Sequence, residues 1–139
     1  MSLNGANWSR NNESAHCDIS QKAVLGRPGG GAWRMPTRAE QEELVNNCSW
    51  QWVTSYNNVS VKGYVVTGNG NSIFLPAAGF RYNSNRGYEG AYCGFWSSSL
   101  DEGSSDNAQF MDFNITIGSA GRNVVGLRYY GFSVRAVCE

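Results

Sequence analysis

The sequence predicts an α+β domain in which a mixed, mostly antiparallel sheet carries one or two short helices and long loops. Three observations lead to this prediction. A strong helix signal begins at Thr37, a tight hairpin signal stands at 68–71, and the apolar residues of the closing run at 131–138 recur with a period of two. The 17 glycines among 139 residues also suit a sheet with many turns.

Length and charge indicate the number of domains and the classes of partner that the protein could have. A chain of 139 residues is expected to form one domain, which we place at 15–139, after an N-terminal arm or first strand at 1–14. The formal net charge is zero and only 16% of the residues are charged, which favours neither nucleic acid nor an anionic membrane as a partner. No apolar run in the sequence is long enough to insert into a bilayer.

The segment around Thr37 contains the clearest local signal. A short strand at 32–35 should end at Pro36, because proline cannot continue a sheet ladder. Thr37 and Glu40 have the spacing of a capping box, in which each side chain binds the backbone N–H of the other residue. We therefore predict a helix at 37–47, about three turns long, with Leu44 on its apolar face. A weaker helix is expected at 15–25.

Alternation of apolar and polar residues predicts most of the strands. The Asn69-Gly70 pair predicts a hairpin that joins strands at 61–67 and 72–75. The final run should be the central strand of the sheet, and one face of it should be buried, consisting of Phe132, Val134, Ala136 and Cys138. Further strands are expected at 50–52, 95–100 and 108–113, the last with an irregularity near Asp112 and a continuation in alternation to Ile117, while 80–95 and 118–126 are expected to be loops.

Residues that could perform catalysis are few. His16 is the single histidine and no serine stands in a GxSxG pattern, so a nucleophile has no evident base. The acidic residues at 101–112 lie in or beside a polar turn, where solvated charge is expected instead of acid–base catalysis or a calcium loop. We expect no catalytic residue, no metal ion and no cofactor. The widely spaced cysteines lack a CxxC motif, which favours disulfides of an exported protein over a zinc site: Cys17, Cys48, Cys93 and Cys138.

Four motifs in order support a family resemblance. The segment 33–44 matches the pattern W-R-[LM]-P-T-x-x-E-x-x-E-L, and it is followed by IFLPAAG at 73–79, WSS at 96–98 and GFSVRAV at 131–137. Over 17–138 the chain resembles the Fibrobacter succinogenes major paralogous domain, which is related to the formylglycine-generating-enzyme-like branch of the C-type lectin fold. The resemblance implies a C-type lectin-like fold, which hosts many activities.

The same resemblance bears on the cysteines and on two possible activities. Lectin-like domains often tie their first helix to their last strand, which implies a Cys17–Cys138 disulfide, with Cys48 packed as a small apolar residue under the helix. Calcium-dependent sugar binding is not implied, because WSS at 96–98 stands where the sugar-binding lectins have Trp-Asn-Asp. The formylglycine-generating relatives use a pair of reactive cysteines. Only Cys93 and Cys138 could serve here, and no other part of that site matches.

The C-terminal segment has a second resemblance. Residues 122–135, RNVVGLRYYGFSVR, are similar to the C-terminal end of the variable proteins of diversity-generating retroelements, which are bacterial or phage proteins with a lectin-like fold. These proteins accept variation at exposed positions, and their templates are typically rich in AAC codons that are altered at adenines. Val, Leu, Tyr, Asp, Ser and Gly can arise from AAC in this way, whereas Gln109 and Met111 cannot. An ordinary strand that merely packs is the alternative interpretation of this segment.

We therefore expect a non-enzymatic binding domain, at the cell surface or outside the cell, that displays a tyrosine-rich surface to a protein or glycan ligand. Its export signal would lie outside the given sequence. Tyr, Ser, Gly and Asn are the residues that adaptable binding surfaces favour. The alternatives are an oxidoreductase of the formylglycine-generating type and a structural cell-surface domain. The residues expected to gather on one exposed face are Tyr82, Tyr88, Tyr92, Asp106, Val124, Val125, Leu127, Tyr129 and Tyr130.

Overall fold

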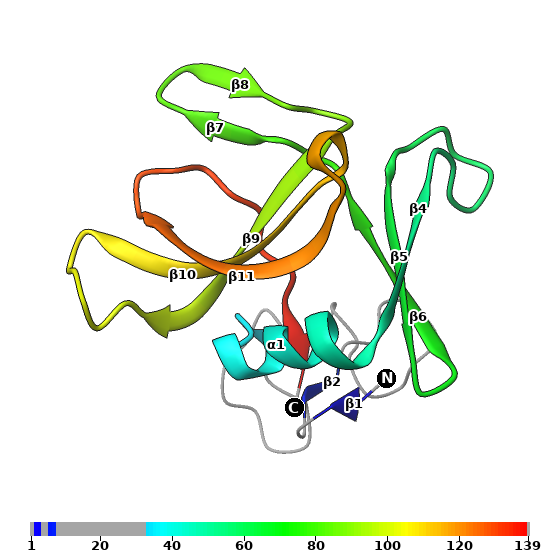
Figure 1. Ribbon diagram of the computed structural model, residues 1–139, viewed down its shortest axis with the longest axis horizontal. Helices are drawn as coiled ribbons and strands as arrows, with labels where there is room; N and C mark the ends of the chain where they lie inside the picture. Colours follow the sequence, from blue (N-terminus) through cyan, green and yellow to red (C-terminus); the bar gives the residue numbers. More distant parts are fainter. Residues whose placement is uncertain (1, 4–5, 8–32, 139) are drawn as a thin grey trace.

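The computed structural model describes residues 2–3, 6–7 and 33–138, and within them the chain is α+β, with one α-helix and mostly antiparallel sheets (Figure 1). One sheet has the order β1-β2-β12-β3, from Ser2–Leu3, Ala6–Asn7, Val137–Cys138 and Trp33–Arg34. A second has the order β11-β10-β9, from Ser119–Leu127, Asn107–Asn114 and Tyr92–Leu100. A third has the order β4-β5-β6, from Ser49–Val53, Gly63–Gly68 and Asn71–Pro76. β7 and β8 form a separate hairpin, from Phe80–Tyr82 and Asn85–Gly87.

The helix predicted after Pro36 is confirmed as α1, Arg38–Asn47. Thr37 is its N-cap: its hydroxyl accepts from the Glu40 N–H at 3.3 Å, and its own N–H donates to Glu40 Oε2 at 2.8 Å. Leu44 is fully buried, and the Gln41 side chain donates to the Phe95 carbonyl at 2.9 Å. These contacts fasten α1 to β9, and Figure 1 shows the helix beneath the β9–β11 sheet.

The β4–β6 sheet also forms where the pattern predicts it. Asn69 and Gly70 both have positive φ, 52° and 75°, and connect the register pair Gly68↔Asn71, as a two-residue hairpin requires. Trp50 and Trp52 alternate along β4 as half-buried residues that pack against the core. The core itself lies between α1, the β4–β6 sheet and the β9–β11 sheet. It consists of Leu44, Tyr64, Val66, Ile73, Leu75, Ala77, Cys93, Phe95, Met111, Phe113 and Val137. Cys48 packs against it as predicted.

Two segments expected to be loops are strands instead. The 80–95 segment contains the β7–β8 hairpin and the start of β9, and the 118–126 segment forms most of β11. β11 has little apolar alternation, but it pairs with β10 from Asn107↔Leu127 to Asn114↔Ser119. The irregularity predicted near Asp112 is confirmed as a register shift between Asp112 and Asn114.

The alternation predicted to continue to Ile117 is wrong. Residues Ile115–Ile117 form a short 3₁₀ helix, η2. The Asn114 side chain accepts from the Thr116 N–H at 3.0 Å, which caps the turn, and Gly118 ends it in the left-handed conformation. A local cap therefore overrides a strand-like pattern in these residues.

The final strand predicted at 131–138 is also wrong in its length and its faces. Only Val137–Cys138 form β12, whereas Gly131 and Ser133 make single bridges to Arg81 and Phe95. Because the backbone partner changes along this segment, no single pleat runs through it. Val134 is accordingly 52% exposed while Val137 is fully buried, the reverse of the predicted pattern. The central position is confirmed for the described residues, since β12 lies between β2 and β3.

Some expectations fall outside the described residues. These are the helix at 15–25, His16, most of the arm at 1–14, and the Cys17 partner of the expected disulfide. Among the helices that the structure does describe, none combines the length and apolar character needed to cross a bilayer.

Candidate binding surface

The β7–β8 hairpin lies on the side of the β9–β11 sheet away from α1 (Figure 1). Phe80 in β7 is the ring around which other rings gather. Its centroid lies 5.7 Å from that of Tyr88, 5.6 Å from Tyr92 and 5.8 Å from Tyr130. The Tyr88 ring stacks on Phe80 with 12° between the planes, and the other two meet it edge-on. The hairpin thus organises the aromatic packing on this side of the molecule.

The turn after β11 adds two rings to the same group, the exposed Tyr129 and the half-buried Tyr130. Tyr129 lies 5.1 Å from Tyr130 and 5.6 Å from Tyr82 between ring centroids, and Tyr82 lies 5.7 Å from Tyr130. The turn is closed by a hydrogen bond from the Tyr130 N–H to the Leu127 carbonyl at 3.1 Å. We call the six rings in contact the tyrosine cluster: Phe80, Tyr82, Tyr88, Tyr92, Tyr129 and Tyr130.

The tyrosine cluster rests on Phe132, which follows β11, and on two rings of the sheet, Phe110 in β10 and Trp96 in β9. Phe132 stacks on Tyr130 at 5.6 Å with 20° between the planes, and contacts Phe110 at 4.5 Å and Trp96 at 4.8 Å. Gly94 makes room for this packing, because a Cβ there would lie 2.8 Å from the Phe132 ring. The glycine therefore lets Phe132 lie flat against β9 and connect the exposed tyrosines to the sheet.

Exposure differs within the tyrosine cluster. Tyr88, Tyr129 and Tyr82 are 61%, 58% and 42% exposed, whereas Tyr92 and Tyr130 are half-buried. Adjacent exposed aromatic rings on a soluble domain are characteristic of binding sites, because each ring offers a large contact area with few rotatable bonds. The cluster therefore has an exposed rim, which consists of Tyr82, Tyr88 and Tyr129, and a half-buried base, which consists of Tyr92 and Tyr130.

Tyr88 has a strained backbone. Its φ is +60°, in the left-handed region, which disfavours residues with a Cβ by roughly 1–2 kcal/mol. The N–H groups of Ala91 and Tyr92 both donate to the Tyr88 carbonyl, at 3.1 and 3.0 Å, and hold this conformation. Backbone strain of this kind is found preferentially at functional sites.

The remaining predicted site residues are not all brought together. Val124 pairs with Phe110 across the strands, so it shares the aromatic face of the sheet. Val125 and Leu127 alternate with it along β11 and project from the opposite face, although Val125 is 44% exposed. Asp106 is exposed in the turn before β10, and its backbone carbonyl accepts a hydrogen bond from the Arg128 N–H at 3.0 Å. The tyrosines and Val124 therefore share a face that Val125 and Leu127 do not.

Tyr92 connects the cluster to a buried ion pair. It lies near the Asp112 carboxylate, which is 3% exposed and paired with Arg122. Burial, together with the Asp112 carboxylate, raises the pKa of Tyr92 well above its ordinary value. The Tyr92 phenol consequently stays neutral and acts as a hydrogen-bond donor at physiological pH.

Cys93, the cysteine considered for oxidase chemistry, is fully buried in β9. Burial raises the pKa of its thiol above the ordinary value, and the Sγ atom donates to Ser133 Oγ at 3.5 Å. Since the thiolate is the nucleophilic form, this environment keeps Cys93 unreactive. Cys93 and Cys48 are both free thiols.

Comparison with protein families, curated proteins and solved structures finds no match to this chain. Two residues that organise the cluster, Phe80 and Phe132, are not among the site residues that the sequence predicts. A signal for the first was present: Asn83, a turn residue with a φ of +54°, stands between the short runs that form β7 and β8. Phe132 was assigned to the core, and it does pack, but as the support of exposed rings.

Proposed function

We propose that this protein is a non-enzymatic ligand-binding domain with a C-type lectin-like fold, displaying the tyrosine cluster to a protein or glycan ligand outside the cell. The observation that carries the proposal is the exposed rim of Tyr82, Tyr88 and Tyr129 on a packed aromatic base. Tyrosine dominates binding hot spots because one ring supplies both apolar area and a hydrogen-bonding hydroxyl.

We further propose that the chain is a variable protein of a diversity-generating retroelement. Such a protein needs a scaffold whose stability is independent of the residues that vary. The described core lies largely in α1, β4–β6 and the α1-facing side of β9–β11, whereas Tyr129 lies in a turn beyond β11. Changes at the rim would therefore alter the surface with little effect on folding.

A displayed library tests the scaffold property. Tyr82, Tyr88 and Tyr129 are randomised together, and a matched library randomises the buried residues Phe110, Met111 and Phe113. We expect most members of the first library to reach the cell surface at the level of the parent and to resist proteolysis. Most members of the second should fail, because large-to-small changes of core residues cost about 2–5 kcal/mol.

The opposite result returns the tyrosines to a structural role. If the rim library loses surface level and protease resistance as severely as the core library, the chain is a structural domain whose rings only pack. If the rim library folds, the same cells can be sorted against a panel of immobilised glycans and proteins, and the display proposal requires that binding depend on the randomised positions.

A further inference from the structure

The β7–β8 hairpin has a second face that the tyrosine cluster does not use. Arg81 and Arg86 stand directly opposite each other in the antiparallel register, and they alternate with the aromatic residues of β7. Phe80 and Tyr82 therefore occupy one face of the hairpin, and the two arginines occupy the other. Like charges placed directly opposite each other destabilise a hairpin, so the presence of two opposed arginines here is not explained by the stability of the hairpin.

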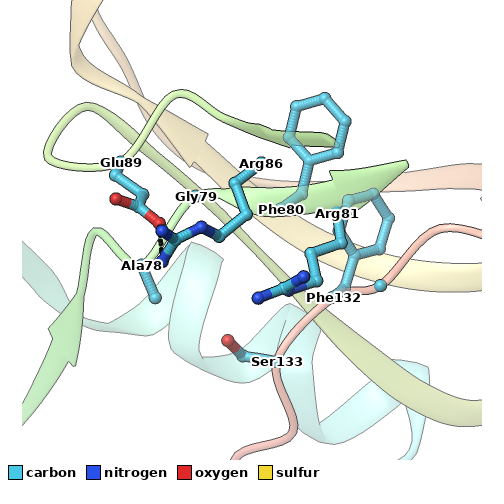
Figure 2. A pocket seen from close by; sticks show the side chains of 9 residues that line it. Ala78, Gly79, Phe80, Arg81, Arg86, Glu89, Phe132 and Ser133 are labelled. Carbon is cyan, nitrogen blue, oxygen red and sulfur yellow. Dashed lines mark ion pairs between the residues drawn. The ribbon is translucent and has the colours of Figure 1, made fainter. Parts of the chain in front are cut away.

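A pocket of about 280 Å³ lies beneath this basic face. Figure 2 shows the Arg81 guanidinium directed towards the Ser133 hydroxyl, with the Arg86–Glu89 ion pair on the other side of the pocket. Arg86 Nη1 lies 3.2 Å from Glu89 Oε1. Within the described part of the chain the Arg81 guanidinium has no carboxylate partner, and its five N–H donors remain available.

Backbone hydrogen bonds hold the walls of the pocket. Arg81 and Gly131 each donate the backbone N–H to the carbonyl of the other, at N···O distances of 3.0 Å and 2.8 Å. A Cβ at position 131 would lie 2.9 Å from the Arg81 Cβ. Glycine at 131 therefore lets the Arg81 side chain lie across the strand. Ser133 is fixed in the same way, because its N–H donates to the Gly94 carbonyl at 2.9 Å and its carbonyl accepts from the Trp96 N–H at 3.0 Å.

The hydroxyl of Ser133 is available as a donor. It accepts a hydrogen bond from the Cys93 thiol at 3.5 Å, and a hydroxyl that accepts still has its own proton to donate. The Arg81 guanidinium and this hydroxyl thus offer convergent donors on a rigid frame. Two arginines and one glutamate give the pocket a net charge of one positive unit.

We propose that this pocket binds the carboxylate of an acidic ligand, with Arg81 as the principal partner and the Ser133 hydroxyl as a second donor. A planar guanidinium matches a carboxylate with two parallel hydrogen bonds. The single positive charge matches a monoanion, and Glu89 disfavours a doubly charged phosphate. The carboxylate belongs either to an acidic sugar or to an acidic side chain of a protein. The pocket shares the Phe80 and Phe132 rings with the tyrosine cluster and its support, but none of the exposed rim tyrosines lines it, so carboxylate binding does not require the rim.

The test is an NMR titration of the ¹⁵N-labelled protein at constant ionic strength. The carboxylate probes are glucuronate, for the sugar, and N-acetylglutamic acid α-amide, for the side chain. Glucuronamide is the uncharged match, and inorganic phosphate is the competing anion. We expect saturable shifts of the Gly79, Gly131 and Ser133 amides with at least one carboxylate, in the millimolar range, and none with glucuronamide. The probe that binds more tightly identifies the source of the carboxylate.

Matched variants locate the binding. R81Q should weaken carboxylate binding at least tenfold, and R81K, which keeps the charge but loses the planar fork, should lie between R81Q and the parent. R128Q is the control for a lost surface arginine, and Y129A is the control for the tyrosine cluster; both should bind as the parent does. A dispersed spectrum for each variant shows that it is folded.

Three results would overturn the proposal: no saturable shift of the pocket amides with either carboxylate, equal shifts with glucuronamide, or unchanged binding in R81Q. Phosphate binding more tightly than both carboxylates would also overturn it. None of these results bears on the display function, because the exposed rim tyrosines Tyr82, Tyr88 and Tyr129 do not line the pocket and are tested by the libraries.

Discussion

Arg122 holds the buried carboxylate of Asp112 with two nitrogens, Nε at 2.7 Å from Oδ1 and Nη2 at 3.1 Å from Oδ2. Asp112 is 3% exposed while Arg122 remains about half exposed, so the arginine stabilises a buried charge from the surface. The same carboxylate lies near Tyr92 and contributes to the raised pKa of that phenol, which places the ion pair beside the tyrosine cluster. This arrangement supports the half-buried base of the candidate surface with a charge pair.

Replacing Arg122 by Ala should lower the free energy of unfolding by about 1.5–3 kcal/mol, because the buried Asp112 carboxylate loses its charged partner. Urea denaturation measures this change. Arg128→Ala is the matched control, since that arginine is exposed and donates only to a backbone carbonyl, and it should change stability by about 0.5 kcal/mol or less. Equal effects of the two substitutions would show that the Asp112 pair contributes nothing specific.

Glu40 should make stability depend on pH in the acid range. Hydrogen bonds from Arg34, at 2.6 and 2.8 Å, and from Thr37 hold the pKa of Glu40 below its ordinary value of 4.5. A carboxyl with a lowered pKa in the folded state stabilises the protein above pH 4.5, and this contribution is lost as pH falls below 4.5 through the folded-state pKa.

Urea denaturation of the parent and of Glu40→Gln, at pH 7 and pH 3.5, measures this contribution. The gap in the free energy of unfolding between the two proteins should be larger at pH 7. Glu42→Gln is the control, because Glu42 forms an exposed pair with Arg38 at 2.6 Å, and such pairs contribute about 0–1 kcal/mol. A gap for Glu40→Gln that does not change with pH contradicts the prediction.

The strained backbone of Tyr88 gives an independent test of the local geometry. Tyr88→Gly and Tyr88→Ala both remove the ring that stacks on Phe80, but only glycine accepts a φ of +60° without strain. The glycine variant should be more stable than the alanine variant by about 1 kcal/mol in thermal or chemical unfolding. An alanine variant as stable as the glycine variant would mean that the left-handed conformation is relaxed in solution.

The two adjacent tyrosines should differ in their effect on stability. Tyr129→Ala should change the free energy of unfolding by about 0.5 kcal/mol or less, because the ring is 58% exposed. Tyr130→Ala should cost about 1–2 kcal/mol, since that ring contacts Phe80 and Phe132 as well as other tyrosines. Trp96→Ala should cost about 3–5 kcal/mol and serves as the packed reference. Equal costs for Tyr129 and Tyr130 would contradict the division into rim and base.

Elements defined by local interactions could be predicted from the sequence. The capping box at Thr37 and Glu40 determines where α1 begins, and the Asn69-Gly70 pair determines the β5–β6 turn; neither depends on distant residues. β11 could not be predicted in the same way. It is a strand because β10 offers hydrogen-bond partners along its length, and its own residues alternate only weakly.

The candidate site was predictable in composition but not in arrangement. Tyr82, Tyr88 and Tyr129 could be singled out as aromatic residues in polar segments, but their meeting depends on the β7–β8 hairpin and its bridge to Gly131. The sequence predicts Val124 and Val125 on one face, whereas the pleat of β11 directs them to opposite faces. The apolar pattern within a segment does not determine which strand, distant in sequence, that segment will pair with.

The most direct test of the central proposal is the DNA sequence of the gene and of its flanks. We expect a nearby reverse transcriptase gene and a near-repeat of the 3′ end of this gene, with differences confined to adenines of the repeat. The differing codons should include those of Tyr129 and Val124 in the form NNC, and should spare those of Gln109 and Met111. A 3′ end without such a repeat, or differences at buried positions such as Phe110 and Phe113, would contradict the account.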